Sequence, residues 1–137
     1  MRVVYPAGHQ IGEQPRVTAR VLANYPLVMM DQGTSVRAVT DLAFNRAGLL
    51  PAPASEATYM MTAIAMVRAG IGLTVLPASA REIVAEPTLQ SRRINDKNFS
   101  RPVALIRKAQ RTPQPLSRLF ADFLMAKRQK IFATGRS

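Results

Sequence analysis

The stretch DQGTSVRAVTDLAFNRAGLLPAP, residues 31–53, runs from a polar turn through a regular apolar pattern to a sharp stop. Apolar residues recur in it at steps of three and four: Val36, Val39, Ala43 and Ala47. Leu42 broadens this apolar stripe. Gly48 fits the position just past a helix end, and the two prolines that follow prevent continuation. The spacing therefore predicts a helix from Thr34 to Ala47.

The turn before this helix, residues 32–35, has two possible roles. It follows YPLVMM, residues 25–30, an apolar run of strand length. In open parallel sheets, ligands bind beyond the carboxyl ends of the strands, and a helix start offers free N–H groups that suit a carboxylate or phosphate. Thr34 and Ser35 add hydroxyl donors, but one of them could simply cap the helix. The residues alone leave both roles open.

The rest of the chain continues the alternation of short apolar strands and amphipathic helices. Further strands are expected at residues 2–5, 52–57, 71–77, 89–94 and 102–108. Further helices are expected at residues 17–24, 58–69, 78–85 and 116–130. The helix at 58–69 carries the stripe Met60, Ala63, Ile64 and Val67, and the last helix carries Leu116, Leu119, Phe120, Phe123 and Leu124. This order predicts an α/β fold with a mainly parallel sheet flanked by helices.

Most catalytic and metal-binding arrangements are missing from the sequence. The chain has no cysteine, which excludes disulfides, zinc-thiolate sites and cysteine nucleophiles. The single histidine, His9, lies in a Pro/Gly loop and is expected to be structural or a surface residue. The Gly70-Ile71-Gly72 sequence follows a helix and precedes a strand, so we interpret it as a helix stop with close packing. The methionines are expected to fill the core, and Asp41 to be solvated in mid-helix. We predict no enzyme activity, no metal and no cofactor.

Charge is distributed unevenly along the chain. The 137 residues have a formal net charge of +11. Residues 1–80 carry six arginines against four acids, whereas residues 81–137 carry nine arginines and four lysines against four acids. Residues 92–130 could attract nucleic acid, but a solvated basic surface is the favoured interpretation. No run of 18 uncharged apolar residues and no signal peptide is present, so we expect a cytoplasmic protein without a membrane partner.

An ordered set of segments resembles the effector-binding domain of LysR-type transcriptional regulators. The set comprises YPLVMMDQGTSVRAVTDLAFNRAGLLP, then TAIAMVRAGIGLTVLPASA, and finally RPVALIRKAQRTPQPLSRLFADFL. YPAGHQIGEQPRV resembles the hinge segment of the same domain. The resemblance covers roughly residues 2–126.

This resemblance implies a fold of two α/β lobes like that of type 2 periplasmic binding proteins. Residues 2–86 would form the second lobe with its hinge, and residues 87–130 would be the returning strand and helix of an incomplete first lobe. Residues 131–137 would be a basic tail. The helix-turn-helix of a full regulator lies outside this sequence, so DNA would be bound only through that domain.

The resemblance also implies a small effector, a carboxylate or other anionic metabolite, held between the lobes, together with self-association into dimers or tetramers. Thr34 and Ser35 would contribute hydroxyl and backbone donors, Gln32 and Gly33 would shape the same rim, and Thr58 would lie close by. Effector binding would change the lobe angle, which requires different affinities for two states. A stand-alone solute-binding lobe and a basic nucleic-acid-binding protein are the alternatives.

Overall fold

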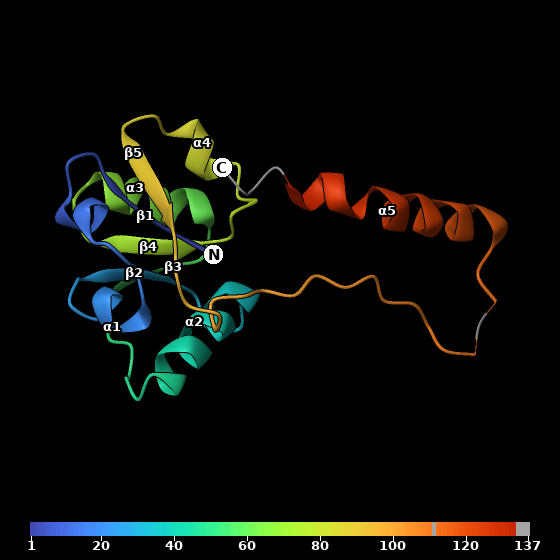
Figure 1. Cartoon of the computed structure of the whole chain (residues 1–137), viewed down its shortest axis with the longest axis horizontal. Helices are drawn as coiled ribbons and strands as arrows, with labels where there is room; N and C mark the ends of the chain where they lie inside the picture. The colour runs from blue at the N-terminus through green and yellow to red at the C-terminus, as the bar shows by residue number, and fades with distance from the viewer. Residues whose placement is uncertain (111, 134–137) are drawn as a thin grey trace. The chain divides into compact units, whose positions relative to one another are not determined.

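The computed structural model describes residues 1–110 and 112–133. The chain divides into two compact units, Met1–Arg101 and Pro102–Ser137. The first unit contains every described strand, and the second contains the long helix α5 (Figure 1). No described helix combines the length and the apolar character needed to cross a bilayer.

The first unit is built on a five-stranded sheet in the order β3-β2-β4-β1-β5. The strands are β1 (Arg2–Pro6), β2 (Leu27–Met30), β3 (Pro53–Ala57), β4 (Leu73–Leu76) and β5 (Leu89–Arg93). Strand β2 runs parallel to β3 and β4, whereas β1 is antiparallel to both of its neighbours. The predicted α/β fold with helices flanking the sheet is confirmed; the sheet is mixed, because β1 runs opposite to its neighbours, which was not predicted.

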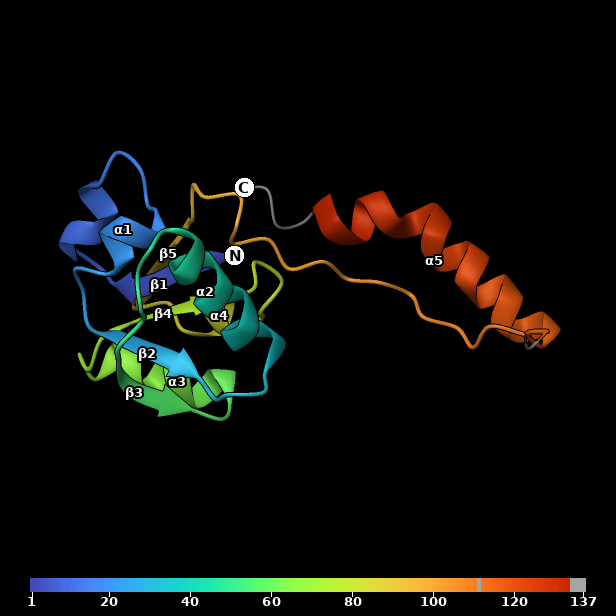
Figure 2. The same ribbon diagram turned by 90° about the horizontal axis from the view of Figure 1, so that it is seen from below.

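Helices cover both faces of this sheet. Helices α1 (Ala19–Leu22) and α2 (Ser35–Arg46) pack on one face, and α3 (Met60–Arg68) and α4 (Glu82–Ala85) pack on the other. Turned by 90°, the molecule shows α1 and α2 in front of the strands and α3 behind them (Figure 2). The central strands β2 and β4 are therefore buried on both faces, which explains their unbroken apolar sequences.

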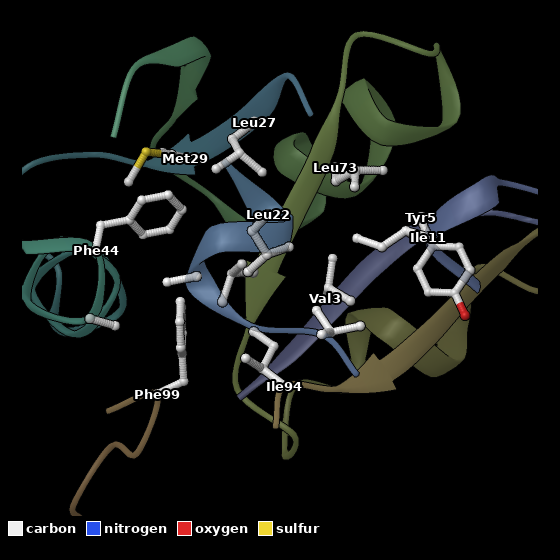
Figure 3. Packing of buried hydrophobic residues seen from close by; sticks show 14 residues of the cluster. Val3, Tyr5, Ile11, Leu22, Leu27, Met29, Phe44, Leu73, Ile94 and Phe99 are labelled. Carbon is white, nitrogen blue, oxygen red and sulfur yellow. The ribbon is translucent and has the colours of Figure 1, made fainter. Parts of the chain in front are cut away.

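A cluster of buried side chains joins α1 and α2 to the sheet. Its members come from segments distant in sequence: Val3, Tyr5, Ile11, Val17, Ala19, Leu22, Leu27, Met29, Ala43, Phe44, Leu73, Val75, Ile94 and Phe99. The rings of Phe44 and Phe99 meet edge to face, with centroids 6.2 Å apart (Figure 3). Phe99 thereby fixes the segment that follows β5 to the same core as α2.

Helix α2 lies within one residue of the predicted bounds at each end, but one member of the predicted stripe is not buried. Thr34 caps it and Ala47 ends it, as expected from the sequence. Leu42, however, is 47% exposed, and the buried residues are Val36, Arg37, Thr40, Ala43 and Phe44. The predicted stripe was wrong at Leu42 because the larger ring of Phe44 takes the core position, which turns Leu42 toward solvent.

The loop that carries His9 has more structure than expected. It contains a 3-10 helix, η1 (Gln10–Glu13), whose Ile11 is fully buried. The His9 Nδ1 atom accepts a hydrogen bond from the Ile11 N–H at 3.2 Å, and its ring packs edge to face on Tyr25. The structural role expected for His9 is confirmed.

The two glycines after α3 have the roles expected of them. Gly70 has φ +78°, the left-handed conformation that ends helices. A Cβ atom on Gly72 would lie 2.5 Å from the carbonyl oxygen of Pro26, which is backbone and cannot move aside easily. The helix stop and the close packing are both confirmed.

The methionines fill the core only in part. Met29 and Met30 are buried in β2, whereas Met61 and Met125 are each 53% exposed. The expectation of core filling therefore holds for the strand and is wrong for these two helical positions.

The second unit contains the predicted last helix but not the predicted strand. Helix α5 spans Pro115–Ala133, so the expected tail begins within it, and residues 134–137 lie outside the described ones. No described residue between 102 and 108 forms a strand, which contradicts the prediction. An isolated extended segment leaves its backbone groups unpaired, so it needs a neighbouring strand that these residues lack.

The first compact unit includes β5 and the residues that follow it. Strand β5 pairs with β1 along five residues, so residues 89–93 belong to the sheet of the first unit. Ile94 and Phe99 lie in its core. The compact first unit therefore extends to Arg101.

Candidate functional site

The turn between β2 and α2, here called the rim turn (residues 31–35), has the geometry of a strand-to-helix connection. Gly33 takes φ +90°, a conformation that costs little only for glycine. No atom lies within 4 Å of a Cβ built there, so the backbone angle and not the space requires glycine. Gln32, Gly33 and Ser35 are exposed at the start of the 12-residue helix α2. The turn is thus a fixed loop that presents polar groups to solvent.

The Thr34 hydroxyl is occupied within the turn. Its Oγ1 atom accepts a hydrogen bond from the Arg37 N–H at 3.1 Å and donates one to the Asp31 carbonyl at 2.9 Å. Capping by a hydroxyl of this turn is therefore confirmed, and Thr34 provides it. Because its proton is already donated, Thr34 is a weaker candidate for direct ligand contact than the sequence suggested.

The Ser35 hydroxyl is differently placed. It accepts a hydrogen bond at 3.2 Å from the guanidinium group of Arg101, 66 residues further along the chain. Among the described residues, no acceptor holds the Ser35 proton. A hydroxyl, a guanidinium group and the N-terminus of α2 therefore meet at one point, a combination suited to a carboxylate or phosphate.

The predicted neighbour Thr58 does reach the rim turn. Its hydroxyl donates a hydrogen bond to the Asp31 carboxylate at 2.8 Å. The Asp31 N–H in turn donates to the carbonyl of Ala57 at the end of β3. Thr58 thus ties the turn to the neighbouring strand, and the Asp31 carboxylate adds a negative charge that weakens the attraction for an anion.

Two side chains that contact residues of the candidate site were not predicted from the sequence. Arg101 has no local signal, because only the fold brings it to Ser35. Arg37 could have been noticed from its spacing of four residues from Asp41, which pairs oppositely charged residues on a helix. Asp41 keeps 36% of its side chain exposed, in line with the solvated position expected, and its ion pair with Arg37 was not predicted.

The site contains no arrangement typical of a metal centre. Within the described part of the chain, no group of three histidine, cysteine, aspartate or glutamate side chains could hold a metal ion. Two of the acidic residues near the rim turn, Asp41 and Glu56, pair with Arg37.

The family model described as "LysR substrate binding domain" matches residues 1–129. The chain belongs to this family. The matching relatives are regulators of transcription. A probable hydrogen peroxide-inducible genes activator of Mycobacterium avium is 33% identical over 81 residues, which is 58% of this chain and 26% of that protein. The uncharacterized HTH-type transcriptional regulator YnfL of Escherichia coli (strain K12) is 31% identical over 85 residues, which is 61% of this chain and 29% of that protein.

Solved structures of the LysR family share the fold. The effector binding domain of QuiR, in complex with shikimate, aligns with a TM-score of 0.73 at 16% identity, covering 94% of this chain and 61% of that one. The regulatory domain of CcmR from Synechocystis PCC6803, in complex with 2-PG, aligns with a TM-score of 0.71 at 19% identity. The alignment covers 90% of this chain and 60% of that one.

The coverage of the relatives is partial. The matched segments span about a quarter of the two curated relatives and about three fifths of the two solved chains.

Proposed function

We propose that this LysR substrate-binding domain senses a small anionic metabolite at the rim turn. The observation that carries the proposal is the contact between the Ser35 hydroxyl and the Arg101 guanidinium at the start of α2. The guanidinium supplies a permanent positive charge, and the helix start supplies backbone donors. The two similar domains solved with bound small molecules support a role in binding an effector.

Within this proposal, the predicted residues have different tasks. Ser35 and Arg101 contact the effector, and Gln32 and Gly33 form the exposed edge beside them. Thr34 and Thr58 hold the turn in shape through Asp31. A carboxylate suits the donors better than a neutral ligand because hydrogen bonds to charged groups are stronger.

We further propose that residues 102–133 belong to a first lobe that is mostly outside this sequence. Val103, Leu105 and Ile106 are at least 58% exposed in a segment without strand partners. Four members of the apolar stripe of α5 are also exposed: Leu116, Leu119, Phe120 and Phe123. A first lobe would bury these side chains and add the second side of the effector cleft, so we expect this chain alone to bind an effector weakly.

The remaining assignments follow from the family. The full-length protein would be a cytoplasmic regulator that self-associates and binds DNA through a separate helix-turn-helix domain. The chemistry of these residues suggests sensing and not catalysis.

The test is a titration of the 137-residue chain with a panel of small carboxylates, followed by the amide NMR shifts of residues 33–36 at low salt. A binding carboxylate should lose about 1 kcal/mol of affinity in Ser35→Ala and about 2 kcal/mol in Arg101→Gln. Ser79→Ala and Arg81→Gln are matched controls, since both side chains are exposed in the loop after β4. Equal affinities in all four variants would contradict the proposal.

A further inference from the structure

Among residues 1–110 and 112–128, Arg37 is the only charged residue that is buried. Its exposed fraction is 7%, although it stands in the first turn of a surface helix. Buried guanidinium groups are rare because removing the charge from water is costly unless it is paired and hydrogen-bonded. The position therefore needs an explanation beyond the helical pattern.

The guanidinium group of Arg37 joins three elements of the fold. Its Nε atom donates to both carboxylate oxygens of Asp41, on α2, at 2.9 and 3.0 Å. One terminal nitrogen donates to Glu56 of β3 at 2.6 Å and to the carbonyl of Met30, the last residue of β2, at 3.1 Å. The side chain thus fixes the ends of two parallel strands relative to the first turns of α2.

The backbone of Arg37 is tied to the rim turn as well. Its N–H donates to the hydroxyl of Thr34, which in turn donates to the carbonyl of Asp31. Asp31 is anchored to the end of β3 through the carbonyl of Ala57 and through Thr58. The rim turn therefore lies between two anchors, and Arg37 is the residue that contributes to both.

The electrostatics of the group agree with a rigid anchor. The hydrogen bond to Glu56 is the largest cause that raises the pKa of Arg37 above its ordinary value, with Asp41 adding to it and burial opposing it. Each carboxylate keeps about a third of its side chain in water, at 36% and 37% exposed. Each acid thus stays partly hydrated, while the planar fork of the guanidinium sets the geometry.

We propose that Arg37 is a positioning residue that holds the rim turn in its ligand-ready conformation, a role that matters for effector affinity only if the proposed function is correct. It does not touch the ligand. It acts through Thr34 and the strand ends, so that Ser35 and the free N–H groups of α2 need no rearrangement on binding. Lysine cannot replace it, because an ammonium group lacks the fork that bonds Asp41, Glu56 and the Met30 carbonyl together.

The test is amide hydrogen exchange on the 137-residue chain without any ligand. The reporters of the rim turn are the amides of Asp31, Thr34 and Ala38, whose hydrogen bonds lie within the anchored segment. The reference amides are those of Leu22 in α1 and Ala69 after α3. The variants are Arg37→Lys and the milder Glu56→Gln, and the control is Arg46→Lys, an exposed arginine on the same helix.

We expect Arg37→Lys to speed exchange of the three reporter amides by roughly tenfold while the reference amides change by less than about twofold. Glu56→Gln should speed the exchange of the same amides by a smaller factor, and Arg46→Lys should not change their exchange rates. Equal acceleration at reporters and references would reduce Arg37 to a contributor to global stability and overturn the proposal. Unchanged exchange rates of the reporter amides in Arg37→Lys would overturn the proposal too. If Arg37→Lys fails to fold, Glu56→Gln decides by the same comparison.

A second measurement separates this inference from the proposed function. Inorganic phosphate is titrated into the wild-type chain and Arg37→Lys, with the amide shifts of residues 33–36 as readout. Saturating shifts that need more phosphate in the variant support both proposals. If phosphate leaves the wild-type amides unmoved, anion binding at the rim turn loses its support, whereas the exchange data still decide the role of Arg37.

Discussion

Helices α2 and α5 have similar amphipathic sequences but opposite surroundings. Both were predicted from apolar residues at steps of three and four, and both are helical. Phe44 of α2 is 1% exposed and lies in the core, whereas Phe123 of α5 is 55% exposed. The pattern specifies a helix in each case, but only a partner surface turns an apolar stripe into stabilising buried area.

The largest expected effect tests this contrast directly. Phe44→Ala should destabilise the first unit by about 3–5 kcal/mol, because it removes a buried ring and leaves a cavity. Phe123→Ala should change the free energy of unfolding by less than about 0.5 kcal/mol. All three tyrosines, Tyr5, Tyr25 and Tyr59, lie in the first unit, so tyrosine fluorescence in urea reports on it. Similar losses of unfolding free energy in both variants would contradict the proposed difference between α2 and α5.

Adding a single carbon atom should also lower the stability in the first unit only. Gly72→Ala should cost about 1–3 kcal/mol, since its new Cβ meets the Pro26 backbone where β2 and β4 begin. Ser117→Thr adds one carbon to an exposed position of α5 and should cost less than about 0.5 kcal/mol. Urea midpoints measured by circular dichroism check both. A tolerated Gly72→Ala would mean that β2 and β4 shift apart easily.

Removing the buried hydroxyl of Thr74 should change the free energy of unfolding by a smaller amount and in the opposite direction. Thr74 is fully buried in β4, and its Oγ1 atom has no hydrogen-bond partner among the described residues. Thr74→Val keeps the shape and removes the unpaired hydroxyl, so we expect a stability change between zero and a gain of about 1 kcal/mol. Thr112→Val, at an exposed position of the second unit, should be neutral. A clear loss in Thr74→Val would indicate a partner for the hydroxyl.

The smallest expected effect depends on pH. The hydrogen bond from the Thr88 hydroxyl, with a further contribution from Arg68, lowers the pKa of Glu86 below its ordinary value of 4.5. The ionised form is thus favoured in the folded protein, so its stabilisation is complete above pH 4.5 and is lost as the pH falls through the lowered pKa.

Glu86→Gln should therefore lower the urea midpoint at pH 7 and have less effect at low pH. Thr88→Val removes the hydrogen bond that contributes most to the lowered pKa of Glu86. It should therefore also lower the urea midpoint more at pH 7 than at low pH. A difference between wild type and Glu86→Gln that stays constant from pH 7 to acid would contradict this assignment.

The candidate site was predictable to the extent that its contacts are local. The Thr34 cap spans three residues, and the glycine at position 33 marks the turn. The contact of Ser35 with Arg101 spans 66 residues, and no spacing rule could have revealed it. The same holds for Glu56, whose pairing with Arg37 depends on β3 lying beside β2.

The sequence by itself determined most of the helices and strands and most of their ends. Periodicity, a capping hydroxyl and the glycines after the helices act within a few residues, so their energies are encoded locally. Only the tertiary structure decided the reversed β1, the buried face of α2, the position of Arg101 and the lack of a strand at residues 102–108. These features depend on which distant segments meet, and that is set by the packing of the whole sheet and its helices.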